Sequence, residues 1–339
     1  AATHFTGSTD SALYAFEFNC DMFGICGFER TGFGDAGGVI ESYAATLAEL
    51  SSLPSMRRRL EGRVRSEEEA GEKEDIGVWG RIEGAFASFE PGVSATNSEY
   101  EIQDTRIRFG ADYPLEDIGL TLGGNLWFGL SNTDISTGGG KIETTGYAAA
   151  ISAAFERNDF YADGQFQFAL FSSDLSASGF PASGSDATAF SVSGEAGYSF
   201  PLSGFNVIPQ AQVIWVSADF DDINIGGGQT ASLGDGAALT GRVGVFADKE
   251  FKGSEGEYGD AGKGNVYAGL NLLVPLDGET AARVGAETLT SELEAVAGEL
   301  NVGGSYAWGE KRGVFGEAAV SLGSEVTEYR ANVGLRFGF

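Results

Sequence analysis

The chain has 339 residues, enough for one large domain or two smaller ones. Its formal net charge of −28 argues against a nucleic-acid partner, because proteins that bind nucleic acids present a basic face. Although 42% of the residues are apolar, no run reaches the ~18–20 apolar residues of a membrane helix, so the membrane structure that this sequence permits is a closed β-barrel.

Residues 1–37 contain both cysteines of the chain, Cys20 and Cys26, which are separated by five residues. This spacing allows a small disulfide loop, which would fit export to an oxidising compartment, or a pair of free thiols. The single histidine, His4, makes a zinc site improbable, and we expect no metal and no cofactor. We interpret 1–37 as a separate short segment with some strand-like order.

We predict that residues 38–76 form helices and a linker. Apolar residues that recur every three or four positions predict an amphipathic helix over 38–50. Pro54 interrupts this pattern, and Ser55 is a suitable N-cap for a second helix. The second helix is rich in arginine: it contains Arg57, Arg58, Arg59 and Arg63. An acidic stretch over 67–75 follows, which we expect to be solvated.

Residues 77–339 repeat a different theme, in which apolar and polar residues alternate with a period of two. The last strand is the clearest case, with Val333, Leu335, Phe337 and Phe339 on one face and Arg330 and Arg336 on the other. The same pattern predicts about twelve strands, at 77–89, 100–113, 118–131, 141–156, 159–172, 188–200, 205–219, 237–250, 264–288, 294–308, 312–322 and 327–339. We therefore predict an all-β fold, a closed antiparallel transmembrane β-barrel whose apolar face meets lipid.

The connections between these strands are alternately short and long, as in outer-membrane barrels. The long ones, near 92–99, 174–188 and 221–236, are polar and rich in glycine and serine, and we interpret them as the long loops of one rim. The connection over 249–263 is long where the pattern requires a short one. Pro275 and Gly278 interrupt the ninth strand, but two strands there would give thirteen, an odd number that bacterial single-chain barrels disfavour.

The polar strand faces suggest what fills the barrel. They supply five carboxylates that would point into the lumen: Glu83, Asp163, Glu195, Glu299 and Glu317. An arginine-rich helix threaded into the lumen would place Arg57, Arg58, Arg59 and Arg63 among them, and a guanidinium pairs well with a carboxylate. We predict an N-terminal helical segment inside the lumen; the alternative is that the arginine segment is a solvated, charged linker.

Six short motifs in order along the chain resemble the C-terminal translocator of autotransporters, the monomeric type V secretion family. They are LPSMRRRLEGR (53–63), GVWGRIEGAF (77–86), VIPQAQVIWV (207–216), LTGRVGVFAD (239–248), NVYAGLNLL (265–273) and NVGLRFGF (332–339). The resemblance covers roughly 50–339. The usual tryptophan-led motif before the tenth strand is absent, with LEAVAGELNVGG in its place.

The resemblance implies a twelve-stranded barrel in the outer membrane of a Gram-negative bacterium, with a helix passing through the pore. It implies three domains: a passenger remnant or short surface segment (1–37), a linker and pore helix (38–76) and the barrel (77–339). It also implies an assembly signal in the last strand, at Val333, Leu335, Phe337 and Phe339. The expected function is to deliver and anchor an N-terminal passenger at the cell surface, with the long loops and the N-terminus facing outward.

The partners implied are outer-membrane lipid and lipopolysaccharide, the barrel-assembly machinery and the passenger segment itself. An alternative function is a stand-alone plugged barrel, either a structural protein or a narrow diffusion channel. A membrane enzyme is a further alternative that we do not favour, because carboxylate pairs such as Asp163 with Glu195 are common in any polar lumen and no Ser-His-Asp set is available.

Overall fold

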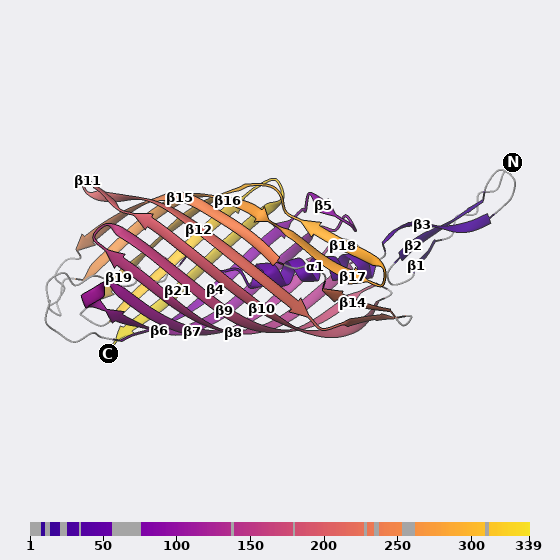
Figure 1. Cartoon of the computed structure of the whole chain (residues 1–339), viewed down its shortest axis with the longest axis horizontal. Helices are drawn as coiled ribbons and strands as arrows, with labels where there is room; N and C mark the ends of the chain where they lie inside the picture. The colour runs from indigo at the N-terminus through magenta and orange to yellow at the C-terminus, as the bar shows by residue number, and fades with distance from the viewer. Residues whose placement is uncertain are drawn as a thin grey trace.

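A computed structural model describes residues 8–10, 14–20, 26–33, 35–55, 76–136, 139–178, 180–226, 229–233, 237–252, 262–308 and 312–339. Twelve long strands form a closed antiparallel barrel, in which each strand pairs with its neighbour along the chain and β21 pairs with β4 to complete the wall (Figure 1). The strands are β4 (Gly77–Phe89), β6 (Tyr100–Leu115), β7 (Leu120–Ile135), β8 (Gly140–Arg157), β9 (Phe160–Ala177), β10 (Phe180–Tyr198), β12 (Phe205–Phe220), β15 (Ala237–Lys252), β16 (Lys263–Asp277), β19 (Ala297–Trp308), β20 (Arg312–Leu322) and β21 (Val326–Gly338). The predicted fold class and strand number are confirmed.

The two ends of the barrel differ. At one end, here the short-turn end, lie the 3₁₀ turn η1 (Glu116–Ile118), the short strand β11 (Phe200–Leu202) beside β12, and the C-terminus. The last residue is fixed there, because the Phe339 amide donates a 3.0 Å hydrogen bond to the Ile76 carbonyl. Helix α1 (Asp35–Leu50) lies inside the barrel near the opposite, long-loop end (Figure 1). Among the described residues, no helix is both long and apolar enough to cross a membrane.

The long loops fold into a second sheet that the sequence did not predict. It has five strands, here called the cap sheet, in the order β13 (Ile223–Gly226), β14 (Gln229–Leu233), β17 (Glu279–Val284), β18 (Glu287–Glu292) and β5 (Val93–Ser94). The predicted single strand over 264–288 is therefore wrong. The barrel strand ends at Asp277, and the chain beyond Gly278 joins the cap sheet, so the break leaves the barrel with twelve strands.

The loop predicted over 174–188 is also wrong for most of its length. Strands β9 and β10 stay paired up to Phe180 opposite Ala177, with one irregularity in register. In this extension the outward face carries polar residues, such as Asp174 and Ser176, while the inward face is buried at Leu175, so the backbone ladder continues without outward apolar residues. The hydrophobic pattern in this sequence therefore marks the lipid-facing part of a strand and not its full length.

A separate three-stranded sheet precedes the helix and lies beyond the long-loop end (Figure 1). It consists of β1 (Ser8–Asp10), β2 (Tyr14–Cys20) and β3 (Cys26–Phe33). Cys20 and Cys26 are opposite each other in the register of β2 and β3. This position is compatible with the disulfide loop that the spacing allows, which stays a prediction.

Small residues inside the wall make room for large ones on the next strand. Trp79 on β4 is opposite Gly110 on β6, and both face the lumen. A Cβ added at Gly110 would lie 2.4 Å from Cζ2 of Trp79 and 2.8 Å from the carbonyl oxygen of Gly124, so only glycine fits under the indole ring.

We predict that Gly110→Ala destabilises the barrel by about 1–3 kcal/mol, the usual range for overpacking, because the methyl group forces the indole or the backbone of the next strand to move. The measurement is the temperature at which the folded, fast-migrating form disappears on an unboiled SDS gel. Gly124→Ala is the matched control, since its nearest neighbour would lie 3.8 Å from the new methyl group. Equal melting of the two variants would contradict the prediction.

Candidate functional site in the barrel lumen

Helix α1 fills the lumen at the long-loop end. Its side chains at Val39, Ile40, Tyr43 and Leu47 are fully buried. They belong to one apolar cluster with inward residues of the barrel wall and with buried residues of the cap sheet. The wall and cap members include Ile102, Ile135, Ile142, Leu175, Phe220, Ile223, Val284 and Leu289. The helix predicted over 38–50 is thus present, but it packs on all sides and leaves no solvated face.

Two hydroxyl groups of α1 meet partners on different strands of the wall. The Tyr43 hydroxyl donates to the Ser185 carbonyl at 3.4 Å, while its ring packs on Phe220 with centroids 5.0 Å apart. Thr46 lies 3.4 Å from the hydroxyl of Thr133. A helix whose polar groups meet partners on separate strands is held at one depth and one rotation.

Glu41 connects α1 to the first long loop. Its carboxylate accepts hydrogen bonds from the Ser94 hydroxyl at 2.6 Å and from the Thr96 amide at 2.9 Å. The side chain is buried beneath this loop, outside the spanning strands, and that burial raises its pKa above the ordinary value while the hydrogen bonds oppose the shift. Removing the carboxylate would leave the loop donors without this acceptor.

Residues 51–55 continue from α1 along the inner wall. The Ser51 carbonyl accepts from Ser191 at 2.6 Å and from Gln167 at 3.3 Å, and the Pro54 carbonyl accepts from Gln165 at 2.9 Å. These wall residues lie on the polar faces of β9 and β10. The sequence placed the arginine-rich segment in the lumen; Arg57, Arg58, Arg59 and Arg63 lie outside the described residues, and what the structure places there is α1 with 51–55.

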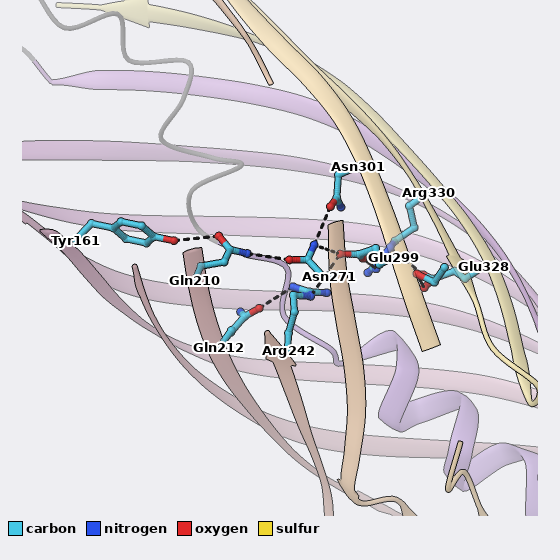
Figure 2. Close-up of polar contacts among 10 residues, drawn as sticks. Tyr161, Gln210, Gln212, Arg242, Asn271, Glu299, Asn301, Glu328 and Arg330 are labelled. Carbon is cyan, nitrogen blue, oxygen red and sulfur yellow. Dashed lines mark hydrogen bonds and ion pairs between the residues drawn. The ribbon is translucent and has the colours of Figure 1, made fainter. Parts of the chain in front are cut away.

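Beyond the end of α1, charged and amide side chains line the inner wall of the barrel; we call this group of side chains the belt. Glu299 is its centre and is 1% exposed. Its carboxylate lies 2.7 Å from the guanidinium of Arg330 and 3.5 Å from that of Arg242, and it accepts a 2.9 Å hydrogen bond from Asn271 (Figure 2). Arg330 also lies 3.0 Å from Glu328. The two guanidinium groups therefore share one buried carboxylate.

The belt extends around the wall as a chain of amides (Figure 2). Gln210 donates to Asn271 at 3.4 Å, and the Tyr161 hydroxyl lies within hydrogen-bond distance of both Gln210 and Glu195, at 3.0 and 2.9 Å. Arg242 donates to Gln212 at 2.6 Å. Polar contacts thus connect β9, β12, β15, β16, β19 and β21 across the lumen wall.

The other predicted carboxylates also face the lumen. Glu83 pairs with Arg81 on its own strand and with Arg108 on β6, 3.1 Å away, and Glu317 accepts a 2.8 Å hydrogen bond from Tyr267. Asp163 and Glu195 are opposite each other in the register of β9 and β10. The structure thus places Glu299 in the chain of Figure 2 and connects Glu195 to it through the Tyr161 hydroxyl, while Glu83 and Glu317 pair with other wall residues.

The sequence analysis missed the arginines of the barrel wall as partners for these carboxylates. Arg81, Arg108, Arg242 and Arg330 occupy polar-face positions of their strands, and that position is the available signal. A cavity of about 70 Å³ remains between the end of α1 and the belt. Its lining includes Glu49, Arg81, Asp104, Arg106, Glu317 and Arg330. In the described part of the chain, no cluster of three or more acidic, histidine or cysteine side chains is arranged to bind a metal ion.

Comparison with known proteins identifies relatives of this barrel. Residues 78–319 match the family model described as the autotransporter beta-domain. The adhesin BmaC autotransporter of Brucella suis biovar 1 is 28% identical over 297 residues, which are 82% of this chain and 9% of that protein. The chain therefore spans less than a tenth of this much longer relative.

Three solved structures share the fold. The transport unit of AIDA-I from Escherichia coli gives a TM-score of 0.67 at 16% identity, covering 89% of this chain and 99% of that one. The translocator domain of NalP from Neisseria meningitidis gives 0.64 at 12% identity, with coverage of 89% and 99%. The beta domain of Bordetella BrkA gives 0.59 at 18% identity, covering 78% and 100%.

The pairing of Glu299 with two buried guanidinium groups generates a prediction. Glu299→Gln leaves Arg242 and Arg330 close together without their shared counter-charge, and breaking a buried ion pair in this way costs about 3–5 kcal/mol. We expect the folded form on unboiled gels to disappear at a clearly lower temperature. Asp134→Asn is the control, because its ion pair with Lys141 is half exposed on both sides and should contribute little. An unchanged gel transition temperature for Glu299→Gln would contradict the expectation that this carboxylate stabilises the barrel.

Proposed function

The chain belongs to the autotransporter β-domain family, and on this premise we propose that it delivers an N-terminal passenger to the cell surface and then anchors it there. The domain is an outer-membrane β-barrel of the translocator type. One observation carries the proposal. Helix α1, upstream of β4 in the chain, occupies the lumen at the long-loop end, whereas β4 itself begins at the short-turn end, where Ile76 contacts Phe339. An upstream passenger would leave through the long-loop end.

This geometry suggests an orientation. Short turns of bacterial barrels face the periplasm and long loops face outward, so residues 1–37 and the cap sheet would lie at the cell surface and Phe339 in the periplasm. The outward residues of the last strand, Val333, Leu335, Phe337 and Phe339, are exposed in the folded barrel and would contact the barrel-assembly machinery before the wall closes. Lipid and lipopolysaccharide would then surround the apolar face.

The alternative of a diffusion channel finds little support. A channel needs an open lumen, and here α1 fills the long-loop end with a buried apolar cluster. The proposed domain division is a short surface segment (1–37), a linker with the lumen helix (38–76) and the barrel (77–339). The Brucella relative is named as an adhesin; for this chain, the activity of any passenger is a separate question from transport.

We predict that an epitope tag placed before Ala1, behind a secretion signal, becomes accessible to added protease on intact Gram-negative cells. The physical reason is that the chain leaves the lumen at the surface-facing end. The measurement is loss of the tag, with a periplasmic marker protein left uncut. A tag that is cut only after the outer membrane is permeabilised would contradict both the transport and the orientation.

The same cells test the assembly signal. Phe337→Ala with Phe339→Ala should reduce folded barrel and surface tag together, because the terminal strand loses two outward aromatic side chains. Phe251→Ala is the control, an aromatic at the same end of the barrel on β15 that is about as exposed as Phe337.

The arginine segment is proposed to sit among the lumen carboxylates. Reversing Arg57, Arg58 and Arg59 to glutamate should lower the temperature of the gel transition and increase single-channel conductance in planar bilayers, since like charges repel strongly where water is scarce. The control carries the same charge change at three exposed cations of the short-turn end, Arg157, Lys252 and Arg312. Unchanged stability together with unchanged conductance would favour a solvated linker.

A further inference from the structure

The seam where the last strand meets the first is held by thirteen opposed residue pairs, from Val326 opposite Phe89 to Gly338 opposite Gly77. On the lipid side, both strands present a run of apolar and small residues. Because side chains alternate with a period of two, sliding one strand by two residues keeps every outward residue outward. Contact with lipid therefore excludes a slip of one residue at this seam but not a slip of two.

An inward contact distinguishes these registers. The guanidinium of Arg336 on β21 extends across β4 and lies 3.5 Å from the carboxylate of Asp112 on β6. The Asp112 side chain is fully buried, and that of Arg336 is mostly buried. The route passes over Gly77, where an added Cβ would lie 2.2 Å from Nη2 of Arg336. The missing side chain of Gly77 leaves the space that the guanidinium occupies.

A slip of two residues affects this contact differently in the two directions. In the observed register Arg336 is opposite Trp79. One slip places Arg336 opposite Arg81, where like charges repel, and the other places it opposite Gly77. The slip toward Arg81 moves Arg336 about 7 Å along the strand, at roughly 3.4 Å per residue, away from Asp112, which is opposite Gly77. The slip toward Gly77 brings Arg336 level with Asp112 and breaks instead the hydrogen bond from the Phe339 amide to the Ile76 carbonyl.

We propose that Arg336, paired with Asp112 across Gly77, excludes the slip toward Arg81 and so sets the register of the last strand on that side when the barrel closes. Arg336 is thus a positioning residue for closure. The lipid-facing residues of the same strand contact lipid in all of these registers and do not select one of them. The inference concerns barrel assembly and does not depend on passenger transport.

Cysteine pairs across the seam report the register directly. Ser88 and Thr327 are opposite each other on the outward faces, so Ser88→Cys with Thr327→Cys forms a disulfide in the observed register. Ser88→Cys with Tyr329→Cys reports one slip, and Phe86→Cys with Thr327→Cys reports the other. The full chain, with Cys20→Ser and Cys26→Ser throughout, is refolded into detergent, oxidised and analysed on gels.

We expect only the Ser88–Thr327 disulfide when Arg336 and Asp112 are unchanged. Asp112→Arg or Arg336→Asp alone should raise the fraction with the Ser88–Tyr329 disulfide, which reports the slip toward Arg81, roughly tenfold, as reversal of one member of a buried ion pair costs enough to change a population ratio by that factor. The double variant, Asp112→Arg with Arg336→Asp, restores opposite charges and should return the disulfide to the Ser88–Thr327 pair.

Two outcomes would overturn the proposal. If either single variant melts earlier but still forms the Ser88–Thr327 disulfide alone, the ion pair stabilises the barrel without setting its register. If the single variants fail to fold and the charge-exchanged double variant fails as well, the pairing of the two charges is not what closure requires. Loss of surface display with an intact Ser88–Thr327 disulfide would instead count against the proposed transport function.

Discussion

The structure depends on one constraint: a sheet in hydrocarbon must pair all of its backbone amides and carbonyls within itself. Closure of β21 on β4 meets this condition, and the other features follow from it. A closed sheet has an inside, so every second side chain is removed from lipid. Those inward positions then hold groups that lipid would exclude, such as Glu299 and Arg242, and they do so only because the wall has no free edge.

The interior is divided into two parts with different chemistry. Near the long loops, α1 packs like a helix in the core of a globular protein, with Ile40, Tyr43 and Leu47 fully buried. Farther in, carboxylates, guanidinium groups and amides satisfy one another. The apolar part obtains its stability from burial, and the polar part from complementary pairing, which fixes geometry more strictly than packing does. Apolar packing therefore holds the helix at the long-loop end, while ion pairs and hydrogen bonds hold the inner wall farther along the lumen.

The elements that follow a local periodic pattern were predicted from the sequence. Strands 77–89 and 312–322 have the predicted bounds, and the helix over 38–50 was found from its spacing. Prediction failed where paired strands have no local sequence pattern. Polar hairpins above the membrane, such as the end of β9 near Ala177, keep their ladder without alternation. The cap sheet forms from loops distant in sequence, including β5 and β18, and no single loop carries a signal for that pairing.

The carboxylates of the lumen were found and their wall partners were not, for a reason that lies in barrel geometry. Three inward arginine pairs each pass over one intervening strand: Arg336 reaches β6 over β4, Arg330 reaches β19 over β20, and Arg242 reaches β19 over β16. Second-neighbour strands are about 9.6 Å apart, a distance that a concave wall shortens and a long guanidinium side chain can span. The residues passed over are small or polar, among them Gly77 and Asn271, and they leave the path open. Pairing rules that consider only adjacent strands cannot find such contacts, because the partner is two strands away. The intervening residue permits the contact because it has no large side chain in the path.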